Sequence, residues 1–169
     1  HLFVYGALVA LYSSEELFFC ACLGSVLIGI SVVDIRRFEV PDTFSLILAG
    51  LGLFHLFYHP GVSWSDHLVA GFGFSFVLYA VAEIYFRMKG RDGLGFGDVK
   101  LVFGLGLLLG VEGSIWALLL AAVSGAATLI AFAAWPRLPV DPLPASGLAF
   151  APFLCLSSWA VFLQERAAW

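Results

Sequence analysis

Long apolar runs fill this sequence, and they restrict its fold more than any other feature. Charged residues, prolines and glycines divide them into seven runs, at residues 2–12, 17–33, 43–58, 68–86, 99–111, 114–135 and 146–163. A soluble chain of 169 residues, 62% of them hydrophobic, could not hide so much apolar surface from water. Most runs exceed the length of barrel strands and lack period-two alternation, so a chain in lipid must form helices. The sequence therefore predicts an all-α, polytopic bundle of about six to seven transmembrane helices.

The same pattern predicts one transmembrane domain over residues 1–169. The chain begins at His1 within an apolar run, and we interpret residues 1–12 as the end of a truncated helix. All three cysteines lie inside apolar runs, whereas a structural zinc site needs four closely placed ligands. We therefore expect neither a zinc domain nor a metal or other cofactor, and no segment predicts a methyltransferase domain.

Positive charges fall on one side of the predicted topology. If the chain crosses the membrane at each run, seven of its eight lysines and arginines share one face, and only Arg166 lies opposite. The seven are Arg36, Arg37, Arg87, Lys89, Arg91, Lys100 and Arg137. Short cytoplasmic loops collect such residues, so this face is predicted to be cytoplasmic. The net charge of −4 and the absence of a basic stripe argue against a nucleic-acid partner.

Asp34 and Asp98 are the candidate catalytic pair. Asp34 follows the second run and Asp98 precedes the fifth, so an alternating topology brings both to one membrane depth. An ionisable group inside a membrane is costly and usually has a function. Two neighbouring carboxyl groups share a proton, so that one activates water while the other acts as general acid toward the scissile carbonyl. The pair therefore predicts an intramembrane aspartyl peptidase.

Residues next to Asp98 are candidates for an active-site loop. Gly95 and Gly97 carry no side chains, so the backbone can approach another chain closely, as an extended peptide substrate requires. Lys100 could tune the acidity of Asp98 or neutralise a substrate carboxylate, although its side chain could equally reach out to the membrane interface.

Several other interpretations stay open. Asp34 beside Arg36 and Arg37 could be only an interfacial ion pair, and Asp98 near Lys100 could be another. Paired intramembrane carboxylates also relay protons in transporters, but a proton-coupled transporter predicts inverted repeats and sites at the midplane, and we find no repeat. A non-catalytic assembly protein of the same fold is a third alternative.

Three smaller features suggest structural roles. Glu83 and Arg87 are four residues apart, which is the spacing of an ion pair on a helix. Glycines within residues 104–110 favour close helix contact. The histidines His55, His59 and His67 are expected to form hydrogen bonds at the interface opposite the aspartates, rather than a metal site.

The aspartate motifs resemble those of the type IV prepilin peptidase family, the GxGD-type intramembrane aspartyl peptidases. Residues 90–101, GRDGLGFGDVKL, are similar to the second aspartate motif of that family, and residues 34–42, DIRRFEVPD, are similar to the first. Residues 147–154 resemble its Pro-Phe-Gly-Pro-Phe-Leu element, with Ala149 and Ala151 as departures. The likeness extends over about residues 13–163.

The resemblance implies a reaction and a location. It implies cleavage of the leader from type IV prepilin-like or pseudopilin substrates, after a glycine, at the cytoplasmic face of the bacterial inner membrane. Such substrates serve type IV pili or protein secretion, and they combine a basic leader with a hydrophobic helix. Asp34 and Asp98 would be catalytic. Arg36 and Arg37, which we interpret first as determinants of topology, are candidates for substrate binding together with Pro41.

Overall fold

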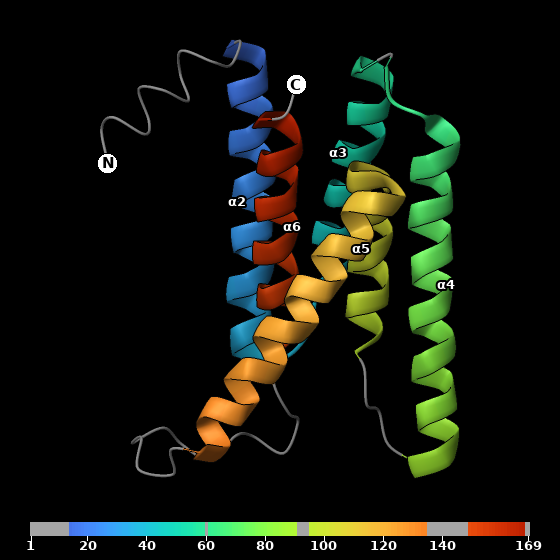
Figure 1. Cartoon of the computed structure of the whole chain (residues 1–169), viewed down its shortest axis with the longest axis vertical. Coiled ribbons are helices and arrows are strands. Elements are labelled where there is room, and N and C mark those ends of the chain that lie inside the picture. Colours follow the sequence, from blue (N-terminus) through green and yellow to red (C-terminus); the bar gives the residue numbers. More distant parts are fainter. Residues whose placement is uncertain (1–13, 60, 91–94, 135–148, 168–169) are drawn as a thin grey trace.

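The structure, a computed structural model, describes residues 14–59, 61–90, 95–134 and 149–167. These residues form an all-α bundle, as predicted, and Figure 1 shows its helices standing side by side. The five helices are α2 (Ser14–Arg37), α3 (Asp42–Tyr58), α4 (Trp64–Lys89), α5 (Phe96–Ala134) and α6 (Ala151–Ala167). The predicted helix end at residues 1–12 lies outside the described residues.

Helix α5 is broken into two arms at Gly110. The backbone of Gly110 has φ 67° and ψ −172°, a conformation that is essentially restricted to glycine. Figure 1 shows that the chain reverses direction there, so residues 96–109 rise beside α4 and residues 111–134 descend across the bundle. The Asp66 carboxylate accepts the N–H of Val111 at 3.1 Å, and this bond anchors the start of the second arm to α4. The two arms correspond to the runs 99–111 and 114–135. The sequence had suggested a break at Glu112 and Gly113, but the structure has it at Gly110.

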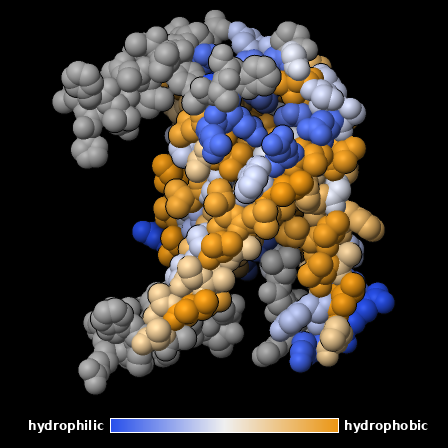
Figure 2. All heavy atoms as spheres, viewed as in Figure 1, coloured by the Kyte–Doolittle hydropathy of each residue, from blue (hydrophilic) through white to orange (hydrophobic). Residues whose placement is uncertain are grey.

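By length and composition, three helices are apolar enough to cross a membrane: α2 from Glu16 onward, α4, and Phe96–Ala131 of α5, although the break at Gly110 divides this last segment into two arms of opposite direction. The protein is therefore a membrane protein, although the described residues show fewer spans than the six to seven that we predicted. Helix α3 is apolar but has only 17 residues. Figure 2 shows a mostly hydrophobic band over the middle of the visible face, with hydrophilic side chains gathered toward the ends of the bundle.

Close helix contact through glycine holds α5 against its neighbours. A Cβ atom on Gly106 would lie 2.6 Å from the backbone of Gly71 in α4, and one on Gly104 would lie 3.1 Å from the backbone N of Ala49 in α3. The first arm of α5 is accordingly the most buried segment, and its leucines belong to a core that also contains residues of α2, α3 and α6. Close contact is thus confirmed for Gly104 and Gly106, whereas Gly110 forms the break.

Successive helices run in opposite directions, which sorts the charges between the two ends of the bundle (Figure 1). The end of α2 and the start of α5 lie at one end, here called the aspartate end, and the last turn of α6 lies at the other, here called the Arg166 end. Basic residues occupy the last turns of α2 and α4, at the aspartate end. The described positive charges therefore follow the predicted distribution.

Candidate active site

Asp34 is held in place by the C-terminal helix. It lies in the last turn of α2, and its side chain is buried, with 6% of the residue exposed. Its Oδ2 atom accepts a hydrogen bond from the backbone N–H of Ala151, the first residue of α6, at 3.1 Å. The first N–H groups of a helix have no partner within the helix and attract negative charge. The N-terminus of α6 therefore provides a favourable binding site for this carboxylate.

The chain leaves α2 by a tight turn directly after Asp34. Phe38 adopts a positive φ of 53°, and its N–H donates to the carbonyl oxygen of Asp34 at 2.8 Å. A residue in the left-handed conformation after a helix is a common way to satisfy the last carbonyls. This turn directs Val40 back under the bundle, where it is buried.

Asp98 approaches Asp34 from the first turn of α5. It is 8% exposed, its backbone N–H donates to the carbonyl oxygen of Gly95 at 3.0 Å, and its carboxyl group lies close enough to Asp34 for their charges to interact. Both aspartates thus sit buried at the same end of the bundle, although they come from helices that are distant in the sequence. Burial of two neighbouring carboxyl groups is costly for structure alone and is typical of functional sites.

Gly97 allows this meeting because a side chain there would collide with the turn after α2. A Cβ atom on Gly97 would lie 2.9 Å from the Cβ of Val40 and 3.2 Å from its backbone N. A Cβ on Gly95 would meet only the Asp98 carboxylate, at an ordinary 3.6 Å. Gly97 is therefore needed for packing within the molecule, a role that the sequence reasoning, which considered access for a substrate, did not identify.

Lys100 pairs with a carboxylate outside the central pair. Its Nζ atom lies 2.6 Å from Oδ1 of Asp42, at the start of α3, and 4.8 Å from the centre of the Phe96 ring. The ion pair joins the first turn of α5 to the first turn of α3 beside the aspartates. Asp42 was missed as a site residue, although an acidic residue after proline at a helix start was a usable signal.

The other predicted substrate-binding residues lie nearby on the surface. Arg36 and Arg37 are exposed in the last turn of α2, and Pro41 precedes α3, where its carbonyl oxygen accepts the N–H of Phe44 at 3.0 Å. These positions place all three at the aspartate end, where they stay candidates. Cys155, which lies inside an apolar run of the sequence, is buried in α6, close enough to both aspartates for electrostatic interaction.

The histidines form hydrogen bonds, as predicted. His55 Nδ1 and His59 Nε2 lie 3.3 and 2.9 Å from a guanidinium nitrogen of Arg166, while His67 Nδ1 lies 2.9 Å from the carbonyl oxygen of Leu107. Within the described part of the chain, no three His, Cys, Asp or Glu side chains are grouped as metal ligands. The predicted ion pair of Glu83 with Arg87 is confirmed at 2.7 Å.

Comparisons with known proteins point to one protein family. The model of the type IV leader peptidase family matches residues 21–130. The chain is similar to a prepilin leader peptidase/N-methyltransferase of Pectobacterium carotovorum subsp. carotovorum, with 31% identity over 132 residues, 78% of this chain and 46% of that protein. A protein of the same name from Neisseria gonorrhoeae is 30% identical over 150 residues, 87% of this chain and 49% of its own length.

The similarity covers only part of each relative. A further prepilin leader peptidase/N-methyltransferase, from Xanthomonas campestris pv. campestris, is 30% identical over 149 residues, which are 83% of this chain and 47% of that protein. The chain thus spans about half the length of the curated relatives it matches. No solved structure matches the chain.

Proposed function

The chain belongs to the type IV leader peptidase family, and we propose that it is an aspartic endopeptidase in which Asp34 and Asp98 cleave the leader from prepilin-like or pseudopilin proteins. The observation that supports the proposal is that two carboxyl groups, one from α2 and one from α5, are buried at the same end of the bundle, close enough for their charges to interact. Relatives that bear the name prepilin leader peptidase/N-methyltransferase supply the substrate class.

Two carboxyl groups in this arrangement can hydrolyse a peptide bond without a metal. One carboxylate takes a proton from water, whose oxygen attacks the scissile carbonyl carbon. The other carboxyl group donates its proton as the carbon–nitrogen bond breaks, so that the leaving nitrogen departs as an amine. The N–H of Ala151 fixes the orientation of Asp34 for this task, because it binds Oδ2.

The reaction is proposed to take place at the cytoplasmic face of the inner membrane. Support comes from the basic residues in the last turns of α2 and α4, which lie at the aspartate end. A substrate with a basic leader in the cytoplasm and a hydrophobic helix in lipid presents its cleavage site at this depth. Arg36, Arg37 and Pro41 are proposed to contact it there.

Single carboxamide substitutions test the proposal. We expect Asp34→Asn and Asp98→Asn each to reduce leader removal from a purified type IV prepilin in detergent by at least about 10³-fold, because each removes one partner in proton transfer. Glu83→Gln, the same chemical change in an exposed ion pair, is the matched control and should process the prepilin normally. Normal processing by either aspartate variant would rule out the two-carboxylate mechanism.

A further inference from the structure

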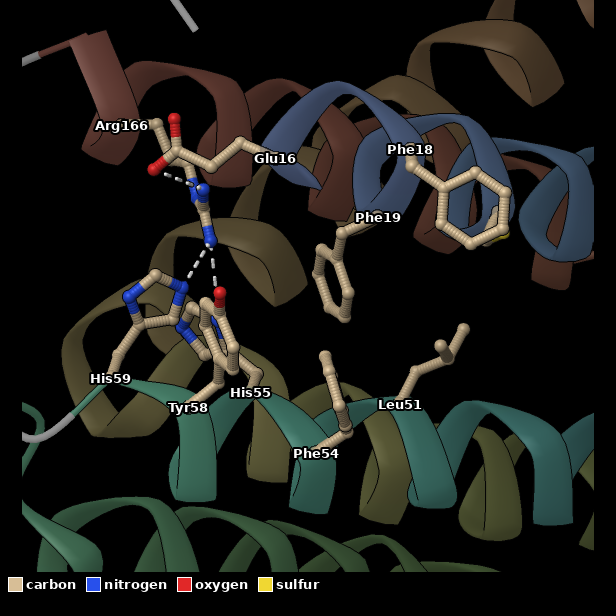
Figure 3. A pocket seen from close by; sticks show the side chains of 10 residues that line it. Glu16, Phe18, Phe19, Leu51, Phe54, His55, Tyr58, His59 and Arg166 are labelled. Carbon is tan, nitrogen blue, oxygen red and sulfur yellow. Dashed lines mark hydrogen bonds and ion pairs between the residues drawn. The ribbon is translucent and has the colours of Figure 1, made fainter. Parts of the chain in front are cut away.

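A cavity of about 660 Å³ lies at the Arg166 end of the bundle, opposite the aspartates. It opens between α2, α3 and α6, as Figure 3 shows. Its size falls within the range of about 300–1,000 Å³ that is usual for small-molecule sites. It is mostly apolar with a few polar groups gathered at one end, which is the usual composition of a ligand site. None of its lining residues has a role in the proposed peptidase reaction.

The polar end of the cavity is built around a buried cation. The side chain of Arg166 is only 10% exposed, and its guanidinium donates to His59 Nε2 at 2.9 Å and lies 3.4 Å from the Glu16 carboxylate. Arginine can only donate, so the imidazole nitrogen that faces it must be an acceptor. Burial, and then the charge of Arg166, lower the pKa of His59, which keeps this imidazole neutral. The cavity therefore ends in one cation and one anion side by side.

The rest of the cavity is a hydrophobic slot between α2 and α3. Phe18, Phe19 and Cys22 line it from α2, and Leu51 and Phe54 line it from α3. Figure 3 shows Phe19 and Phe54 reaching toward one another from the two helices, and their ring centres are 6.0 Å apart. One end of the cavity is thus polar and the other apolar, as in an amphiphile.

The depth of the cavity in the membrane matches that of a lipid. Glu16 is the first residue of the membrane span of α2, so the polar end lies where head groups meet hydrocarbon. The lining from Glu16 to Cys22 covers about 9 Å of helix, at about 1.5 Å per residue. A helix crossing the bilayer would need a groove of about 30 Å, so this short slot fits the upper part of an acyl chain better than a transmembrane helix.

We propose that this cavity binds a phospholipid with an amine head group, of the phosphatidylethanolamine class. Its phosphate accepts hydrogen bonds from the N–H groups of Arg166 that His55, His59 and Glu16 do not occupy, since arginine carries five such groups. Its ammonium group lies beside Glu16, so that this carboxylate, which is already 3.4 Å from Arg166, has a second positive charge next to it. One acyl chain lies in the slot along Phe18, Cys22 and Leu51, beside the stacked rings of Phe19 and Phe54. The inference is independent of the proposed peptidase activity.

Titration of the delipidated full chain with lipid, followed by native mass spectrometry, tests this proposal. We expect one phosphatidylethanolamine to bind per chain, phosphatidylglycerol to bind more weakly, and diacylglycerol, which lacks the phosphate, not to be retained. Arg166→Gln should lower the affinity for phosphatidylethanolamine at least about tenfold, as expected for loss of one charged hydrogen bond. The control Arg87→Gln removes an exposed arginine at the opposite end of the bundle and should bind normally.

A second pair of variants tests the apolar slot without touching the buried charge. Cys22→Trp fills the slot and should abolish binding, whereas Ala21→Trp adds the same ring to the exposed neighbouring position and should leave binding intact. Melting temperatures in detergent establish that each variant is folded. Equal retention of diacylglycerol and phosphatidylethanolamine, or normal binding by folded Cys22→Trp, would overturn the proposal. So would stronger binding of phosphatidylglycerol, because Glu16 then plays no part in recognition.

Discussion

Replacing Gly97 with alanine should damage the candidate active site through a single added methyl group. The new Cβ would lie 2.9 Å from the Cβ of Val40, whereas carbon atoms prefer a separation of about 3.5–4.0 Å. The start of α5 and the turn after α2 must then move apart by about 0.6–1.1 Å to restore that separation. The atoms that collide include the backbone of Val40, so rotation of a side chain cannot relieve the contact.

This displacement separates the two aspartates, because Asp98 follows Gly97 directly and Asp34 lies at the other side of the same turn. Misplacement of catalytic groups by about 1 Å costs on the order of 10²-fold in rate. The free energy of unfolding should change less than the rate does. Overpacking costs about 1–3 kcal/mol, and alanine in a helix recovers roughly 0.5–1 kcal/mol relative to glycine.

The assay compares kcat/KM for prepilin processing in detergent with the melting temperature of each variant. Gly97→Ala should lose about 10²-fold in activity while it stays folded. Gly95→Ala should lose much less, because its Cβ meets only the Asp98 carboxylate at 3.6 Å. Gly73→Ala, a helical position with open space around it, is the control for the substitution itself. If Gly95→Ala and Gly97→Ala lose activity equally, the glycines serve the approach of substrate and the packing argument is wrong.

Three further predictions use the same preparation. Ala151→Pro should lower activity at least tenfold with little loss of melting temperature. Proline is tolerated at the first helical position, but it removes the N–H that binds Asp34. The control Ala151→Gly keeps this N–H and should stay active. Gly110→Ala should destabilise the chain by about 1–3 kcal/mol in thermal unfolding, since its φ of 67° and extended ψ suit only glycine, and an unchanged melting temperature would contradict this. Because the pKa of His59 is lowered in the folded chain, the unfolded chain binds a proton more readily. The free energy of unfolding should therefore fall as the pH drops below about 6.5. His59→Asn should show a shallower fall in this free energy between about pH 7.5 and 5.5.

The helices could largely be predicted from the sequence because lipid leaves the backbone few alternatives. Apolar runs bounded by charge and proline locate α2, α3, α4 and α6 to within a few residues. The break in α5 was placed at Glu112 and Gly113 because charge interrupts the run there. Its true position at Gly110 depends on one positive φ and on the Asp66 carboxylate, which comes from another helix. The hydropathy of the sequence contains no information on this backbone conformation or on the contact with Asp66.

The candidate site could be predicted only in outline. Alternating topology brings Asp34 and Asp98 to one end, because the direction of each helix follows from the order of the runs. The partner of Asp34 could not be predicted, since the N–H of Ala151 is a backbone group, carries no residue signature and lies 117 positions away. The ion pair of Lys100 with Asp42 joins residues 58 positions apart and likewise required the folded structure.

The hydrogen bond from α6 to Asp34 makes the order of synthesis matter. Both aspartates are translated well before Ala151, which follows Asp34 by 117 positions. A nascent chain that has inserted only α2 to α5 carries both acidic groups but lacks the donor that orients one of them. Its carboxylates can gain their working geometry only when α6 docks. Full activity would then arrive only after α6 has been translated, and a product lacking α6 would sit inert in the bilayer.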